Sequence, residues 1–354
     1  MTKTLRPNRR QLCLGLAALP LVSACSTRSM PVSRPARTTA GARRTAVLLP
    51  LSGKRAALGK TMAKAIWLTE DLGGAQARSL ILDAGESPEA AAGAAREAKA
   101  QGADVLVGPL FRTQVPAVLA VAGTTPVLSL SNDNGLAGQG AWVFGVTPAQ
   151  SVQAVLRYAK SSGARRITML ETTGALGERA RTAFAAGARQ AGARMLPAVP
   201  GATKSTDMAA ALRRAGGDAL PDIIYVPQAG RTALAQAVAA VQTGVTTIGS
   251  MQWSGLPAAQ FAALDKACFT GPDPQRFDRL SDRFRAQLDE DMGVIGALAV
   301  DAVAFAQSAG RGADLAQRKP VDGLLGPTRF GPNRVCDRAL SILRISGGGV
   351  SRVA

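Results

Sequence analysis

A strand–turn–helix unit recurs along this sequence and limits the folds that the chain can adopt. Its first copy lies at 46–53, AVLLPLSG, where an apolar run meets a Leu-Pro-Leu-Ser-Gly turn, and a helical pattern follows over 56–72. A continuous apolar run bounded by turn residues is typical of a parallel strand that is covered on both faces. Further strands of this kind are expected at 80–83, 105–109, 126–130, 166–170, 223–226 and 246–249, alternating with helices. This alternation predicts an α/β fold built on doubly wound parallel sheets.

The stretch 142–148, WVFGVTP, interrupts the alternation and divides the chain. We expect two lobes joined by several crossovers. The first would hold 45–146, with 275–320 returning to it; the second would hold 147–274, with 321–354 returning. Two helices, at 277–288 and 293–308, have no strand between them. The runs 326–330 and 336–345 flank a Pro/Gly/Asn turn and predict a hairpin.

The first 44 residues have the composition of a targeting segment. A basic head with Lys3, Arg6, Arg9 and Arg10 precedes the apolar stretch 12–22, which is shorter than the roughly 20 residues of a membrane-spanning helix. Leu21-Val22-Ser23-Ala24-Cys25 resembles a bacterial lipobox, which implies a signal peptide over 1–24 and lipidation of Cys25. An ordinary cleavage site beside a chance cysteine is the alternative. Ser26 after the cysteine implies the outer membrane, and 25–44 is expected to be a flexible tether.

The net charge of +18 would ordinarily suggest a nucleic-acid partner. Residues 1–45, however, hold nine Lys or Arg and no acid, which leaves 18 − 9 = 9 for the remainder. The other basic residues are scattered over predicted helices, where they indicate solvated faces and no nucleic-acid groove. They include Arg96, Lys99, Arg179, Arg181, Arg213, Arg214, Arg283 and Arg285.

The residues that most enzymes depend on are missing. There is no histidine, which removes the commonest general base and zinc ligand, and there is no G-x-S-x-G or S-x-x-K motif. Gly59-Lys60-Thr61 follows Gly53 with five intervening residues, where a P-loop needs four. We therefore expect no enzyme, no cofactor and no metal site.

Polar residues follow the predicted strands of the first lobe, at the edge where open α/β sheets bind ligands. The candidates for contact with a small-molecule ligand are Ser52, Arg112, Thr113, Ser129, Ser131, Asn132 and Asp133. Arg112 can pair with a carboxylate or phosphate. For Ser129, Ser131 and Asn132, capping of a turn is an equal alternative. Cys268 and Cys336 remain after the leader, and an exported pair is expected to form a disulfide.

The paired lobes, Gly108-Pro109-Leu110, the crossover 144–148 and the terminal Cys336 hairpin resemble type I periplasmic solute-binding proteins, and most closely the penicillin-binding protein activators. In amino-acid receptors of this fold, the ligand's carboxylate is held at positions that correspond to 111–113 and 131–133. Here a Phe and an Arg replace a small hydroxyl-bearing run, and Leu176-Gly177 replaces a Tyr-Gly pair. These departures favour the activators.

The resemblance therefore implies a non-catalytic lipoprotein, anchored in the outer membrane and facing the periplasm. It would bind and activate a penicillin-binding protein, a peptidoglycan synthase. The alternative is the substrate-binding protein of an ABC transporter for amino acids or a small anionic ligand.

Overall fold

The computed structural model of the chain describes residues 44–353 apart from 75–77, 218, 309–314 and 318. The predicted signal peptide, the lipidation site Cys25 and the predicted tether up to residue 43 lie outside the described residues. Within the described ranges, no helix is both long and apolar enough to cross a membrane.

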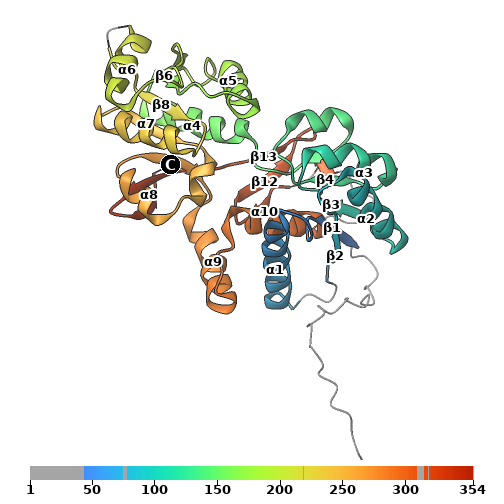
Figure 1. Cartoon of the computed structure of the whole chain (residues 1–354). Helices are drawn as coiled ribbons and strands as arrows, with labels where there is room; N and C mark the ends of the chain where they lie inside the picture. The colour runs from blue at the N-terminus through green and yellow to red at the C-terminus, as the bar shows by residue number, and fades with distance from the viewer. Residues whose placement is uncertain (1–43, 75–77, 218, 309–314, 318, 354) are drawn as a thin grey trace, which may run out of the picture. The chain divides into compact units, whose positions relative to one another are not determined.

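Five parallel strands form the first sheet, in the order β2-β1-β3-β4-β5 (Figure 1). Their bounds are β1 Thr45–Leu49, β2 Leu80–Asp83, β3 Val105–Val107, β4 Val127–Ser129 and β5 Trp142–Val143. On β1, Val47 and Leu49 pack in the cluster that contains α1 (Ala56–Leu72) and α10 (Gly293–Gln307). Ala46 and Leu48 pack in the cluster of α2 (Pro88–Ala100) and α3 (Val115–Ala122) on the opposite face. Burial on both faces explains the unbroken apolar run of the sequence.

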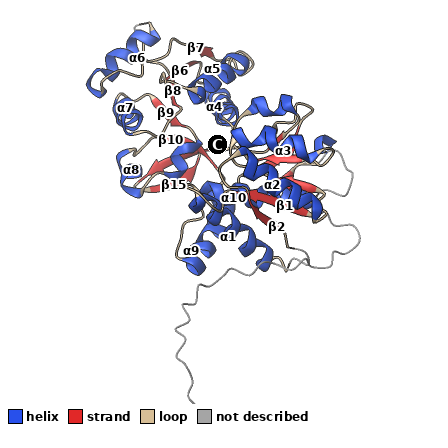
Figure 2. Cartoon of the chain, turned by 45° about the vertical axis from the view of Figure 1, so that its right-hand side comes forward, coloured by secondary structure: helices blue, strands red, loops and turns tan. Residues whose placement is uncertain are grey.

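The second sheet has seven strands, in the order β15-β14-β10-β9-β8-β6-β7 (Figure 2). Their bounds are β6 Arg166–Met169, β7 Arg194–Met195, β8 Ile223–Val226, β9 Thr246–Gly249, β10 Cys268–Gly271, β14 Ser341–Ser346 and β15 Gly349–Arg352. Strands β6 to β10 run parallel, whereas β14 is antiparallel to β10 and to β15.

Helices cover both faces of the second sheet. Ile223 and Tyr225 of β8 belong to the core cluster of α4 (Pro148–Ser162) and α5 (Ala175–Gly187). Ile224 and Val226 face the opposite cluster, where the helices are α6 (Met208–Gly216), α7 (Arg231–Gln242) and α8 (Ala258–Ala263). The second sheet is therefore doubly wound, like the first.

A third, antiparallel sheet joins β11 (Val321–Gly323), β12 (Gly326–Phe330) and β13 (Cys336–Arg338). The predicted hairpin is confirmed for β12 and β13. Its second arm is shorter than predicted, because the run 336–345 divides into β13 and β14, which belong to different sheets. The division lets Cys336 pair with Phe330 while Ile342 pairs with Thr270 of the second sheet.

The chain passes more than once between the lobes, each of which is a parallel sheet with its helices. Helix α9 (Pro274–Leu288) follows β10 of the second sheet and leads to α10, which packs along α1 in the first lobe. The chain then returns through the third sheet to β14. These connections confirm the predicted fold class of two parallel-sheet lobes joined by several crossovers. The residue limits assigned to each lobe from the sequence stay a prediction.

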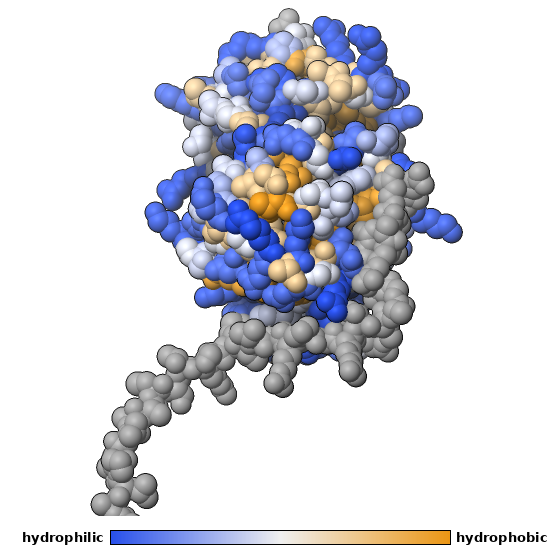
Figure 3. Space-filling model, turned by 90° about the vertical axis from the view of Figure 1, so that its right-hand side faces the viewer, coloured by the Kyte–Doolittle hydropathy of each residue, from blue (hydrophilic) through white to orange (hydrophobic). Residues whose placement is uncertain are grey.

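Charged residues on α2 lie on a hydrated surface. Arg96 and Lys99 are both exposed, and the Nζ of Lys99 donates to the carbonyl of Val121 at 2.8 Å. Figure 3 shows the side of the molecule that carries α2 and α3, which is mostly hydrophilic with apolar areas near its middle and in its upper part.

Candidate functional site

Asp83, at the end of β2, closes the turn that follows β1. Its Oδ1 accepts hydrogen bonds from the backbone N–H groups of Leu51 (2.9 Å), Ser52 (3.2 Å) and Gly85 (2.8 Å). Burial alone would raise the pKa of Asp83, but the hydrogen bonds from the Ser52 side chain and these amides outweigh burial and lower the pKa. Ser52, a predicted ligand contact, here holds the turn together.

Arg112 and Thr113 lie in the short turn η1 (Arg112–Gln114) after β3. Gln114 is fully buried, and its Nε2 donates to the carbonyls of Ala84 (2.9 Å) and Gly85 (3.1 Å). These bonds fix η1 against the loop after β2, so that the exposed side chains of Arg112 and Thr113 project from a rigid support.

The segment after β4 is organised by its own side chains. The amide of Ser131 donates to Ser129 Oγ at 3.2 Å, the amide of Asp133 donates to Ser131 Oγ at 3.3 Å, and the amide of Gly135 donates to Asp133 Oδ1 at 3.1 Å. Such bonds are the turn-capping role of short polar side chains. They leave Asp133 Oδ2 for another partner.

Asp133 Oδ2 has two such partners, one from each lobe. Asp133 Oδ2 lies 2.8 Å from the guanidinium of Arg179 on α5 and 3.3 Å from Nε of Arg112. The Asp133 side chain is 12% exposed and that of Arg179 is 27% exposed, whereas Arg112 is 66% exposed. Two cations thus converge on one carboxylate that is largely shielded from water, a setting that strengthens their attraction. We call Asp133, Arg112 and Arg179 the ion triad.

A small pocket lies beside the ion triad. Its volume is about 50 Å³, and its lining residues are Asn132, Val146, Thr147, Pro148, Ser151, Leu176, Ala180, Tyr225, Pro227, Ser250, Met251 and Gln252. A water molecule occupies about 30 Å³ in the liquid, so this volume holds one or two waters. Burial raises the pKa of Tyr225, and its hydroxyl hydrogen-bonds with Ser151. The pocket is therefore small, and its Ser250 hydroxyl donates to the carbonyl of Pro227 at 2.8 Å.

The structure brings together only part of the predicted ligand-contact set. Arg112 and Asp133 are in contact, and Asn132 lines the small pocket. Ser52 and Thr113 are not among the residues that line this pocket. The remaining two, Ser129 and Ser131, are buried within the capped segment.

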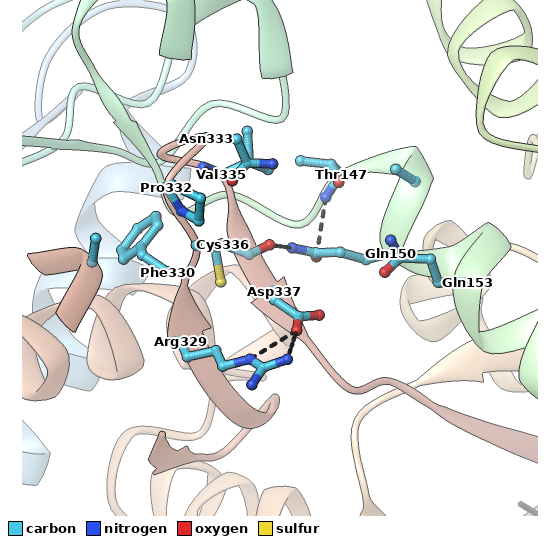
Figure 4. Close-up of a pocket in the computed structure, with 13 residues that line it drawn as sticks. Thr147, Gln150, Gln153, Arg329, Phe330, Pro332, Asn333, Val335, Cys336 and Asp337 are labelled. Atoms are coloured by element: carbon cyan, nitrogen blue, oxygen red, sulfur yellow. Dashed lines mark hydrogen bonds and ion pairs between the residues drawn. The ribbon is translucent and has the colours of Figure 1, made fainter. Parts of the chain in front are cut away.

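A larger pocket, of about 670 Å³, lies between the start of α4 and the turn that joins β12 to β13 (Figure 4). Figure 4 shows Gln150 at its centre, accepting from the amide of Thr147 (3.2 Å) and donating to the carbonyl of Cys336 (2.7 Å). Arg329 and Asp337 pair at 3.0 Å, so these charges are matched within the pocket.

The expected disulfide between Cys268 and Cys336 is wrong: both thiols are free and buried. Cys268 belongs to β10 of the second sheet and Cys336 to β13 of the third, so each is held by a different set of strand pairs. Burial raises the pKa of each thiol. Both side chains serve as apolar packing groups.

The described residues contain no group of three or more histidine, cysteine, aspartate or glutamate side chains that could hold a metal ion. What the ion triad and the small pocket provide is two guanidiniums, a carboxylate and several hydroxyls.

The sequence model of the periplasmic binding proteins matches residues 44–349. The chain belongs to this family. No curated protein matches the sequence. Among solved structures, a putative branched-chain amino acid ABC transporter protein from Rhodospirillum rubrum has a TM-score of 0.75 at 18% identity, covering 88% of this chain and 100% of that one.

Two further structures have the same fold. The C-domain of LpoA from Haemophilus influenzae, described as a regulator of PBP1A, has a TM-score of 0.68 at 16% identity, covering 88% of this chain and 100% of the C-domain. This chain spans only 59% of full-length LpoA. A substrate-binding protein of an ABC transporter from Desulfitobacterium hafniense, in complex with Leu, has a TM-score of 0.64 at 17% identity, covering 88% of this chain and 99% of that one. At these identities the likeness establishes the periplasmic binding protein fold.

Sequence reasoning missed Arg179 in this member of the family. It was interpreted as part of a solvated helix face, and the structure corrects this, because α5 directs its guanidinium at Asp133. A usable signal was its position near the start of a helix that follows the first parallel strand of the second lobe, close to the ligand-binding edge.

Proposed function

We propose that this periplasmic binding protein is a non-catalytic lipoprotein that binds and activates a penicillin-binding protein, and so regulates peptidoglycan synthesis. Cys25 carries the lipid that anchors it in the outer membrane, facing the periplasm. It needs no cofactor, because it acts by docking on the synthase. The observation that carries the proposal is the contact of Asp133 with both Arg112 and Arg179.

A solute receptor of this fold needs cations and hydrogen-bond donors that are free to hold a ligand between the lobes. In this protein the carboxylate of Asp133 already engages a guanidinium from each lobe, so neither is free to hold a ligand's carboxylate. The adjoining space of about 50 Å³ is far below the several hundred Å³ of a ligand pocket. A protein that acts through its outer surface has no need of such a pocket.

The likeness to the LpoA C-domain supports the same proposal, because that protein is a regulator of PBP1A. The part of full-length LpoA that this chain spans is 59% of its length. The docking surface is therefore sought on the periplasmic binding protein domain itself.

The direct test mixes the purified full-length protein with a bifunctional penicillin-binding protein from the same organism. Glycan-strand polymerisation is followed with and without the protein, and complex formation is measured by surface plasmon resonance. We expect a complex and a faster polymerisation rate. A leucine receptor of the same fold serves as the protein control. Absence of a complex, or an equal effect of the leucine receptor, would refute the proposal.

A second function is favoured by one observation, that Arg112 and Arg179 come from opposite lobes. If the lobes separated and Asp133 turned away, both cations would be free to close on an amino acid or another small anion. A thermal-denaturation panel of amino acids decides this, because a ligand at one hundred times its dissociation constant stabilises the folded state by about 2.7 kcal/mol. A rise in the denaturation temperature with an amino acid would show that the protein is a solute receptor and would contradict the proposed activator function.

A further inference from the structure

A further groove, remote in sequence from the ion triad, is lined by three arginines and two aspartates. It has a volume of about 580 Å³ and lies among α1, α9, α10 and the turn between β11 and β12. Its lining residues are Thr69, Arg276, Arg279, Leu280, Arg283, Val300, Asp301, Ala304, Asp322, Gly323 and Leu324. This volume is within the range of small-molecule sites. We call it the α9 groove.

Three arginines of α9 reach the groove because they are spaced at i, i+3 and i+7 along one helix face. Arg276 is paired with Asp322, at 3.3 Å. Arg279 donates through Nε to the carbonyl of Gln275 at 3.0 Å, which leaves its terminal nitrogens for other acceptors. Within the described residues, neither Arg279 nor Arg283 has a carboxylate partner.

The acids that line the groove do not neutralise these two cations. Asp322 is committed to Arg276. Asp301 is 4% exposed, and its two oxygens accept from the amides of Leu324 (2.7 Å) and Leu325 (2.9 Å). The local field of the groove is therefore positive and attracts anions.

The groove also has an apolar side. Leu280 and Val300 are buried, and Leu324 is half-buried beside them. Ala304 of α10 lines the same side. A ligand that fits the whole groove thus combines a negatively charged group with an apolar part.

We propose that the α9 groove binds an amphiphilic oxyanion. Arg279 and Arg283 hold its phosphate or carboxylate group, and its apolar part lies on Leu280, Val300 and Leu324. The source of the oxyanion is either a lipid headgroup or a soluble phosphorylated or carboxylated molecule. Both present the same chemistry to the groove.

The test uses octyl phosphate as the probe and isothermal titration calorimetry on the purified full-length protein. Because a charge-assisted hydrogen bond contributes about 1.5–3 kcal/mol, Arg283→Gln should weaken binding about tenfold or more. Arg285→Gln is the matched control, since it removes the same charge from the same helix but its guanidinium bonds to Asp291 instead of lining the groove. Inorganic phosphate and octanol should each bind more weakly than octyl phosphate. No binding of octyl phosphate, or equal losses in the two variants, would overturn the proposal.

Vesicles distinguish the two sources. Phosphatidylglycerol and phosphatidylcholine vesicles are sedimented with the wild-type protein and with the double variant Arg279→Gln/Arg283→Gln. Binding to phosphatidylglycerol that the double variant abolishes supports the proposal with a lipid headgroup as ligand. Octyl phosphate binding without vesicle binding supports it with a soluble ligand. A double variant that keeps full affinity for octyl phosphate contradicts it.

Discussion

Asp133 and Arg179 form an ion pair of 2.8 Å that links the loop after β4 in the first lobe to α5 in the second. The same carboxylate fixes the local turn through its other oxygen, which accepts from the amide of Gly135. The first lobe thus fixes the position of Asp133, and Arg179 pairs with it from the second lobe. The pair therefore links the two lobes.

A double-mutant cycle on Asp133→Asn and Arg179→Gln should reveal this link. Because both side chains are largely shielded from water, we expect a coupling free energy of about 1 kcal/mol in urea unfolding. The matched control is the exposed pair Arg181 and Glu178 on the same helix, with side chains 45% and 67% exposed. Its coupling should stay below about 0.5 kcal/mol. Equal coupling in the two cycles would contradict the structure.

Gly249→Ala should destabilise the second lobe. A Cβ at this position would lie 2.0 Å from the ring of Trp253, which is fully buried and donates from Nε1 to the carbonyl of Gln228 at 3.0 Å. Overpacking of this kind costs about 1–3 kcal/mol of unfolding free energy. Gly255→Ala is the control, because a Cβ there meets nothing within 4 Å. Urea denaturation measures both, and similar midpoints would count against the packing described here.

Asp83 should make stability depend on acid pH. Its folded pKa lies below the ordinary value of 3.8, so the ionised group stabilises the fold above the unfolded pKa, and this contribution is lost as the pH falls through the folded pKa. Asp83→Asn should therefore be less stable than the wild type near neutral pH. The difference in unfolding free energy between the two proteins, measured by urea titration, should decrease from about pH 5 downwards. If this difference in unfolding free energy stays constant with pH, it does not come from the ionisation of Asp83.

Cys268 and Cys336 should both react with iodoacetamide after unfolding without a reductant. In the folded state both should react slowly, because burial excludes the reagent and raises the pKa of each thiol, which keeps the thiolate scarce. Peptide mass mapping gives the labelled fraction. A disulfide-linked pair of peptides that contains both cysteines would contradict the assignment of Cys268 and Cys336 as free thiols.

Local patterns were enough to predict the parallel sheets. The run 46–49 is apolar throughout because both faces of β1 are covered, and α2 is capped by the residue directly before it, Ser87, which accepts from the amide of Ala90 at 3.2 Å. These features depend on residues that are close in the chain. That is why the fold class could be predicted from the sequence alone.

The candidate site depended on contacts that local patterns do not contain. Arg112 was predicted to hold an anion, but the partner in the structure is the protein's own Asp133, another residue of the predicted set. Arg179 joins them only through the packing of the second lobe. Similarly, the division of 336–345 is set by β10, because Ile342 pairs with Thr270. Partners that are distant in sequence decide these features.

The return of the chain through both lobes has a consequence for the order of folding. The core of the first lobe requires α10, which follows every parallel strand of the second sheet in sequence. The second sheet in turn requires β14, which pairs with β10 only after α10 and the third sheet have been made. Neither lobe is encoded by one continuous stretch, so a growing chain cannot complete one before starting the other. The native pairing of β14 with β10 becomes possible only when synthesis has passed residue 346.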